Sequence, residues 1–465
     1  MNELNTDSAP AGAAKEARLA NGTLVAYSLP ATGVAFLGLM ISVYYFKFAV
    51  DDLLVAPAVL GTIFMIARIW DAISDPLAGY LSDRTTTRLG RRRPWLVASI
   101  LPIAAFSLMP WSPPAGLEGA WLIAWLVVGL LLFETASTAF TVPHTALAAE
   151  LSLDHHERTR IFAFRYVGVG IGFVALAGAM QLMTTTDDPR GMAQIIMLWG
   201  GGVTALLIVV SVARVRERPE HAGRGAKRPV GAVLDVWRNH HSRLLLVVLT
   251  IESMGAASLG LLGPFVMEYV VGDESLFPVL LMCFFVPTLL FIPFALPISR
   301  RLGKKRTWLA GMALSGASFG LLVFVGPDTL WITFVAGPGA GIGMAIGSMI
   351  GPSVKADVVD VDELLTGERK EGLYYAVWNF SRKCAGGIMG GVTGLVLQWV
   401  GFEPNAEQSE ATRRAIVLLF GLLPASGYLI GVLIFWRFGL TEQEHARVRA
   451  ELDRRASSSD DFQRP

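Results

Sequence analysis

The chain has 465 residues, of which 53% are hydrophobic and 17% charged, and its mean hydropathy is +0.51. Soluble domains carry about 25% charged residues, so the composition argues against a soluble protein. The net charge of +1 gives no indication of a nucleic-acid partner. Cys283 and Cys384 both lie in apolar runs, which favours free buried cysteines over a disulfide or metal framework.

Apolar runs of roughly 18–28 residues alternate with short polar connections along the chain, a pattern typical of transmembrane helices. We predict an all-α membrane protein with a cytoplasmic N-terminal tail (1–22), a six-helix bundle (23–212), a central cytoplasmic loop (213–242), a second six-helix bundle (243–437) and a cytoplasmic C-terminal tail (438–465). The twelve predicted spans are 23–46, 54–81, 95–112, 119–147, 161–183, 191–212, 243–271, 275–298, 307–326, 330–353, 372–400 and 412–437.

The basic residues set the predicted orientation. About 32 of the 39 Lys and Arg residues fall in the termini and the even-to-odd connections, and about 4 in the opposite connections. By the positive-inside rule, both termini are expected in the cytoplasm of a multi-pass protein in the inner (plasma) membrane.

Two basic turns recur at the same place in the two predicted halves. LGRRRPWL (89–96) follows the second span, and LGKKRTWL (302–309) follows the eighth. Their shared Leu-Gly, basic and Trp-Leu positions indicate parallel repeats about an axis along the membrane normal, as in transporters. The alternative is that the positive-inside rule makes every cytoplasmic loop basic.

The second predicted span carries three charges within an apolar helix. In RIWDAISDPLAGYLSD (68–83), Arg68, Asp71 and Asp75 stand at i, i+3 and i+7 and share one narrow stripe. Three charges at the bilayer centre cost about 8–10 kcal/mol, and the apolar residues of the span return about 3–7 kcal/mol. The stripe must therefore face the protein interior.

Two carboxylates and one guanidinium on this stripe leave a surplus negative charge. Neighbouring carboxylates in a low dielectric need a cation or a proton between them, so the stripe is a candidate site for a coupling ion, Na⁺ or H⁺. For Arg68, a static charge pair between helices is the alternative. The chain has no Walker A pattern, so an ion gradient is the expected energy source.

Three long segments carry a resemblance to a known family. RIWDAISDPLAGYLSDRTTTRLGRRRPW (68–95), VPHTALAAELSLDHHERTR (142–160) and ADVVDVDELLTGERKEGLYYAVWNFSRKCAGG (356–387) resemble the glycoside–pentoside–hexuronide:cation symporters, the melibiose-permease-like family of the major facilitator superfamily. The resemblance covers nearly the whole chain. It implies a major facilitator fold of two pseudo-symmetric six-helix halves, and cation-coupled symport of a sugar-like solute by alternating access.

The resemblance also assigns residues to the cation site. Asp71 and Asp75 match the family's two cation-binding aspartates, and Ser74 and Thr138 match the polar residues that join them. Lys383 matches a lysine near the carboxylates, whose ammonium would neutralise an aspartate when no cation is bound. No cofactor is expected beyond the coupling ion.

The predicted substrate site departs from the melibiose-type pattern, because Ala35 and Thr141 stand where the family has sugar-binding carboxylates. Arginine binds carboxylates bidentately, so the arginines that remain favour an anionic group on the solute, such as a uronide. The alternatives are that Arg382 pairs with Glu134 or Glu252 or faces the cytoplasm, and that His144 is a packing residue. The predicted substrate-contacting residues are Arg165, Thr141, His144, Tyr374, Trp378, Asn379 and Arg382.

Further charges are predicted to couple the site to movement. Glu134 and Glu252 are intramembrane acids and are expected to join Arg68 and Lys383 in a charge network, with substrate contact as the alternative. We predict a cytoplasmic gate in which basic residues of the first repeated turn pair with acids of a later connection when the cytoplasmic side closes; a merely solvated loop is the alternative. The gate residues are Arg91, Arg92, Arg93, Asp357 and Asp360.

Other classes of function are less well supported by the sequence. Related folds carry lysolipids or other amphiphiles, and the missing sugar carboxylates keep this alternative open. A membrane-embedded enzyme would need a nucleophile with its base or a metal cluster at membrane depth, and a sensor would add a signalling domain. We expect a monomer in the lipid bilayer whose partner is a small-molecule substrate.

Overall fold

The computed structural model describes residues 19–151, 155–215, 217, 236–367 and 371–461. Most of the predicted N-terminal tail and of the predicted central loop lie outside these residues. Within them the elements are helices, and the one β-type pairing is an isolated bridge between Thr87 and Gly90.

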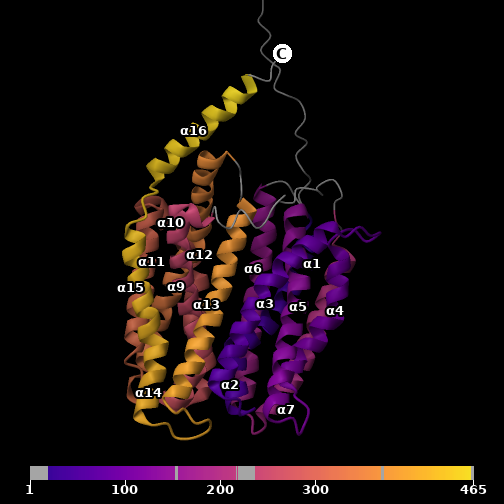
Figure 1. Ribbon diagram of the computed structural model, residues 1–465, viewed down its shortest axis with the longest axis vertical. Coiled ribbons are helices and arrows are strands. Elements are labelled where there is room, and N and C mark those ends of the chain that lie inside the picture. The colour runs from indigo at the N-terminus through magenta and orange to yellow at the C-terminus, as the bar shows by residue number, and fades with distance from the viewer. Residues whose placement is uncertain (1–18, 152–154, 216, 218–235, 368–370, 462–465) are drawn as a thin grey trace, which may run out of the picture.

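The first half of the chain forms one bundle, coloured indigo to magenta in Figure 1. Proline occupies a first-turn position of α3, α4 and α7, where its missing N–H costs no hydrogen bond. The elements are α1 (Asn21–Leu39), η1 (Met40–Tyr44), α2 (Tyr45–Asp51), α3 (Pro57–Arg84), α4 (Arg93–Leu108), η2 (Met109–Trp111), α5 (Gly119–Leu151), α6 (His155–Thr184) and α7 (Pro189–Arg214).

The second half forms a bundle beside the first (Figure 1). Its elements are α9 (His240–Phe265), η4 (Val266–Val271), η5 (Glu274–Leu276), α10 (Phe277–Leu302), α11 (Lys304–Leu322), η6 (Pro327–Thr329), α12 (Trp331–Thr366), α13 (Glu371–Trp399), α14 (Glu410–Val417), η7 (Leu418–Leu422), α15 (Leu423–Trp436) and α16 (Glu442–Asp461). The helix α16 leaves the bundle at the end where α1 begins (Figure 1).

Ten helices among the described residues are long and apolar enough to cross a membrane. The helices α11 and α13, of 19 and 29 residues, lie among them in the bundle but carry more polar residues. The ten apolar helices together with α11 and α13 are consistent with the predicted total of twelve spans. The main difference is α12, which continues to Thr366 instead of ending near residue 353, so Asp357 and Asp360 lie on a helix and not in a loop.

We name the two ends of the bundle by their residues. The terminal end carries the start of α1 and α16, and the Asp51 end carries the last residue of α2. The repeated turns both lie at the terminal end, and their glycines, Gly90 and Gly303, have positive φ angles of 104° and 84°. Glycine adopts such angles without strain, so both turns use their Leu-Gly position in the same backbone region.

The two halves meet along α3 and α13, along η1 and α9, and along α6 and α10. Small residues allow close approach, since a Cβ on Gly61 of α3 would lie 2.6 Å from the carbonyl oxygen of Gly390 on α13. Phe46 of α2 also packs across the halves on Phe265 of α9, with ring centroids 6.1 Å apart. Within the second half, the glycine-rich stretch 337–347 of α12 also packs closely, because Gly341 lies directly against Phe284 of α10.

Candidate cation and substrate site

The charged stripe of α3 faces the interior, as its insertion energy predicted. Asp71 is fully buried, and its Oδ2 lies 2.8 Å from Nη1 of Arg68. The other terminal nitrogen of Arg68 donates to Oε1 of Glu134 on α5 at 2.5 Å. Arg68 thus joins two carboxylates of neighbouring helices, and Glu134 lies in the predicted charge network.

Lys383 connects this cluster to the second half of the chain. Its Nζ lies 2.5 Å from Oδ2 of Asp75 and 3.5 Å from Oδ2 of Asp71. On the other side of Asp75, Thr138 of α5 donates its hydroxyl to Oδ1 at 2.8 Å. Chain positions 308 residues apart are therefore brought into one site, in the arrangement that the resemblance implied.

The cluster has properties that suit a small cation. Its three carboxylates and two basic groups leave one surplus negative charge. Oδ1 of Asp71 and Oγ of Ser74 are buried without a hydrogen-bond partner, and buried oxygens without partners are costly. The Asp75 side chain is 33% exposed and that of Lys383 is 28% exposed, so both can be reached by solvent. These oxygens could take a monovalent ion or a proton. No group of three or more His, Cys, Asp or Glu side chains in the described part of the chain could hold a metal ion.

Glu252 does not belong to this network, which corrects the sequence prediction. It lies on α9 in the second bundle, and its Oε1 accepts a 2.6 Å hydrogen bond from the indole N–H of Trp308 on α11. Its carboxylate also packs over Gly347 of α12. Glu252 therefore joins three helices of one half.

His144 is a packing residue in this structure, which corrects its predicted substrate contact. It is 1% exposed, and its ring stacks on Tyr27 of α1 with centroids 4.3 Å apart. The tyrosine hydroxyl donates to the carbonyl of His144, and the histidine Nε2 lies 3.0 Å from the carbonyl of Tyr27. This reciprocal pair ties α1 to α5.

The aromatic residues predicted to line the substrate site are also buried. Tyr374 and Trp378 are 0% and 1% exposed, so in this conformation neither borders open space. The hydroxyl of Tyr374 accepts a 3.2 Å hydrogen bond from Nδ2 of Asn239, just before α9. Asn379 and Arg382, on the same helix, are exposed.

The remaining predicted substrate residues lie in the first half. Thr141 and Arg165 are half-buried, on α5 and α6. The Nε of Arg165 is buried without a hydrogen-bond partner, which leaves a cationic group available to a ligand.

Lys355 is a candidate that the sequence interpretation missed. It lies half-buried on α12, where its Nζ stands 5.6 Å from the ring centroid of Trp378. Among the described residues no carboxylate forms an ion pair with Lys355, Arg382 or Arg165. There was no clear signal for Lys355 in the sequence, because it lies two residues beyond the predicted span 330–353, where basic residues are common.

In this conformation, the contacts described for the predicted gate residues lie within their own halves, and their pairing when the cytoplasmic side closes stays a prediction. Arg92 donates to Oγ of Ser82 at 2.7 Å and pairs with Asp83, and Arg93 donates to the carbonyl of Val212 at 2.6 Å.

The backbone N–H groups of Arg91, Arg92 and Arg93 all donate to the carboxylate of Glu217. In the other half, Asp357 pairs with Lys304 at 2.6 Å and Asp360 with His445 at 2.9 Å. Where both partners are described residues, the hydrogen bonds and ion pairs that join the halves run from the Asp51 end to Asp75.

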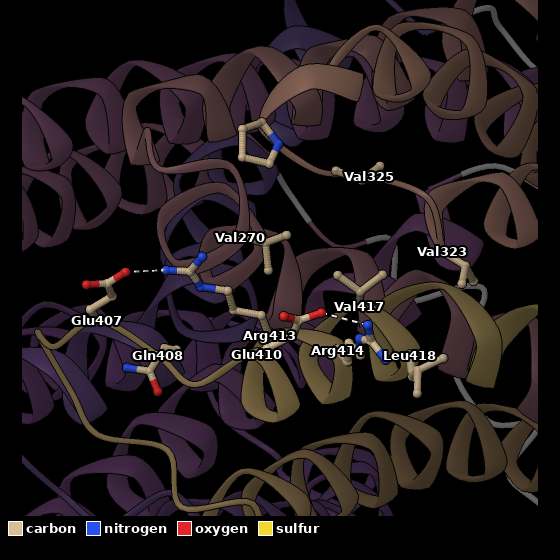
Figure 2. A pocket seen from close by; sticks show the side chains of 11 residues that line it. Val270, Val323, Val325, Glu407, Gln408, Glu410, Arg413, Arg414, Val417 and Leu418 are labelled. Atoms are coloured by element: carbon tan, nitrogen blue, oxygen red, sulfur yellow. Dashed lines mark hydrogen bonds and ion pairs between the residues drawn. The ribbon is translucent and has the colours of Figure 1, made fainter.

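A cavity of about 640 Å³ lies elsewhere, at the Asp51 end of the second half (Figure 2). Val270, Val323 and Val417 line its apolar part. Its charges are satisfied by one another, since Arg413 pairs with Glu407 at 3.2 Å and Arg414 with Glu410 at 2.6 Å (Figure 2). The cavity has no residue from α3, α5 or α13 and is separate from the cation cluster.

Two packed halves of long apolar helices, with ionisable side chains held where the halves meet, define a membrane transporter of the major facilitator type. Residues 26–442 match the family model described as MFS/sugar transport protein, and the chain belongs to this family. The predicted relationship to the glycoside–pentoside–hexuronide:cation symporters is thereby confirmed, and the family consists of transporters and not enzymes.

Relatives of known name support this membership. The chain is 26% identical over 447 residues to the glucuronide carrier protein homolog of Escherichia coli (strain K12), covering 93% of this chain and 95% of that one. It is 26% identical over 473 residues to the sodium-dependent lysophosphatidylcholine symporter 1 of Gallus gallus, covering 92% and 88%. Among solved structures, that of a D-xylose–proton symporter has a TM-score of 0.65 at 14% identity, covering 90% of this chain and 97% of that one, which supports the fold.

Proposed function

We propose that the protein is a secondary active transporter that couples the entry of a cation, Na⁺ or H⁺, to the symport of a sugar-like solute. The observation that carries this proposal is the contact of Lys383 with Asp71 and Asp75 across the two halves. A lysine that occupies the place of a cation can be displaced by one, and its displacement loosens the contact between the halves.

The mechanism follows from the charges. With its surplus negative charge, the cluster attracts a monovalent cation or a proton, which would bind the two aspartates with Ser74 and Thr138. The electrostatic attraction between the ammonium of Lys383 and the two aspartates is then weaker. Ion binding thus changes the free-energy difference between conformations, and a solute that also binds between the halves adds to that change.

We propose that the solute carries a negative charge. Arg165 in the first half, and Lys355 and Arg382 in the second, have no ion pair with a described carboxylate. Arg165 and Lys355 are half-buried, where a cation without an ion pair is costly, and an anionic solute would lower this cost. The relative named as a glucuronide carrier protein homolog supports a uronide or a similar acidic glycoside.

A lysolipid or another amphiphile is the second candidate solute. The relative named as a sodium-dependent lysophosphatidylcholine symporter is as similar to this chain as the glucuronide carrier homolog. A phosphate group would compensate the same three cations as a carboxylate does.

The distribution of basic residues supports a plasma-membrane protein with the terminal end in the cytoplasm. With that orientation, the ion pairs between the two halves lie towards the outer side of the membrane. From this conformation the solute would leave towards the cytoplasm. The chain would act as a monomer, with one central site between the halves.

Uptake into proteoliposomes under imposed Na⁺ or H⁺ gradients tests the coupling. A panel of glycosides, pentosides, uronates and lysophosphatidylcholine, first screened by thermal shift, supplies the solute. Asp71→Asn and Asp75→Asn are expected to abolish gradient-driven accumulation. Glu410→Gln, which neutralises a carboxylate that is 77% exposed, is the matched control and should leave accumulation unchanged. Full accumulation by both aspartate variants would contradict the assignment.

A further inference from the structure

A second lysine joins the halves at the Asp51 end. Lys47 of α2 is 4% exposed although it is charged. Its Nζ lies 2.8 Å from Oδ2 of Asp51, one turn further along its own helix. From the other half it contacts Oε2 of Glu268 on η4, and it lies 3.1 Å from Oε1 of Glu274 on η5.

Hydrogen bonds between the halves surround this lysine. Tyr44, 2% exposed, donates its hydroxyl to Oε1 of Glu274 at 3.0 Å. Asn405 donates its side-chain amide to the carbonyl of Asp51 at 2.8 Å. Within the second half, its backbone N–H donates to the hydroxyl of Tyr269 at 3.1 Å, which helps to hold Asn405 in place. Every one of these groups lies between η1–α2 of the first half and the η4, η5 and 400–408 segments of the second.

The charge count makes Lys47 the critical member. It is the one basic side chain that contacts the three described carboxylates of Asp51, Glu268 and Glu274. The crowding of acids extends to Asp52, where burial, and then the nearby carboxylates of Asp51 and Glu274, raise the pKa to about 6 against the opposing effect of Lys47. Without the ammonium, acids of both halves would face each other across a buried interface and repel.

We infer that Lys47, Asp51, Glu268 and Glu274 form a lock that holds the Asp51 end of the transporter shut, and that the lock must break each time this end opens. The lock goes beyond the proposed function, because it does not depend on the identity of the solute or of the coupling ion. It assigns a conformational role to Lys47.

Distances between spin labels at both ends of the molecule test the lock. The native residues Cys283 and Cys384 are first replaced by alanine. Labels at Asp187→Cys and Asp328→Cys, which are exposed, report the Asp51 end across the two halves. Labels at Arg88→Cys and Leu365→Cys, also exposed, report the terminal end.

In Lys47→Met, the population with the longer distance at the Asp51 end is expected to rise at least about tenfold relative to the population with the shorter distance. The terminal-end distance should shorten in the same sample, because a transporter that alternates closes one end as it opens the other. A misfolded variant would instead broaden both distributions. Glu274→Gln should move the ratio in the same direction by less, and Lys47→Arg, which keeps the charge, should stay close to wild type.

Arg414→Met is the matched control. It removes a basic residue from the same end, but its ion pair with Glu410 lies within one helix and both side chains are more than three-quarters exposed (Figure 2). Unchanged distances in Lys47→Met, or an equal shift in Arg414→Met, would overturn the lock.

Discussion

Two lysines join the halves of this transporter in opposite directions. Lys383 of the second half reaches Asp71 and Asp75 of the first, and Lys47 of the first half reaches Glu268 and Glu274 of the second. The side chain of Lys383 is 28% exposed and that of Lys47 is 5% exposed. Under the proposed function this difference matters: an ammonium within reach of solvent would be exchanged for an ion, whereas a buried one would hold an interface.

The difference in exposure between the two lysines predicts how much stability is lost when each is replaced. Lys47→Met leaves buried carboxylates without their cation, so we expect a loss of about 3–5 kcal/mol of stability. Thermal unfolding in detergent measures this loss as a lowered Tm. Added Na⁺ should restore the Tm less than it does in Lys383→Met, because the side chains of Asp51 and Glu274, 4% and 20% exposed, are less open to solvent than that of Asp75, which is 33% exposed. Equal restoration by Na⁺ in the two variants would show that the buried and exposed clusters do not differ as described.

Lys383→Met should cost less, about 1–2 kcal/mol, because Asp75 is partly hydrated. If the cluster binds the coupling ion, then Na⁺ or acidic pH should raise the Tm of this variant more than that of wild type, since the ion takes the vacated place. The comparison is made at constant ionic strength, with choline replacing Na⁺. An identical response of variant and wild type to both ions would contradict the exchange of lysine for cation.

The second comparison is between the cation cluster, which has a surplus negative charge, and two basic residues of the second half, which have a surplus positive charge. The cluster around Asp71 has one carboxylate in excess, and Lys355 and Arg382 have no described ion pair. Lys355→Gln should weaken binding of an acidic solute about tenfold, near 1.4 kcal/mol, and leave its neutral analogue unaffected. Thermal-shift titration with matched pairs, such as a nitrophenyl glucuronide and the corresponding glucoside, provides the measurement. If the binding of the glucuronide and of the glucoside weakened equally, Lys355 would support the fold and would not recognise the charge of the solute.

The smallest effect is expected at the terminal end. Arg93→Gln removes a hydrogen bond to Val212 but keeps the backbone N–H that binds Glu217, so stability should change by less than about 1 kcal/mol. Uptake should stay within about twofold of wild type at low and at high salt. A large salt-dependent change in uptake would instead support the predicted gate between this turn and Asp357.

Much of this architecture could be predicted from the sequence because the bilayer imposes strong local rules. A span needs a run of apolar residues, and the predicted span 54–81 corresponds to α3 (Pro57–Arg84). The three charges at helical spacing could face only inward, and Asp71 is indeed fully buried. The end of α12 was less predictable, because beyond the membrane a polar helix and a polar loop have similar composition.

Contacts between distant segments could not be predicted from the sequence alone. Helical spacing placed Arg68 beside Asp71, but only the resemblance indicated Lys383, 308 positions away from Asp75. Lys47 was passed over because a lysine near a span end normally reaches the interface, and only the packing of η4 and η5 against α2 encloses it. Trp378 and His144 were expected at the substrate because their side chains can bind ligands, yet their neighbours bury them.

The sequence by itself determined the helices, the repeated turns and which charges must avoid lipid, because these depend on hydropathy and on spacing along one helix. The tertiary structure decided which of those charges meet, which remain without a partner, and which end of the molecule is held shut. Those outcomes depend on how the two halves pack on each other, and small residues such as Gly61 and Gly390 allow their close approach.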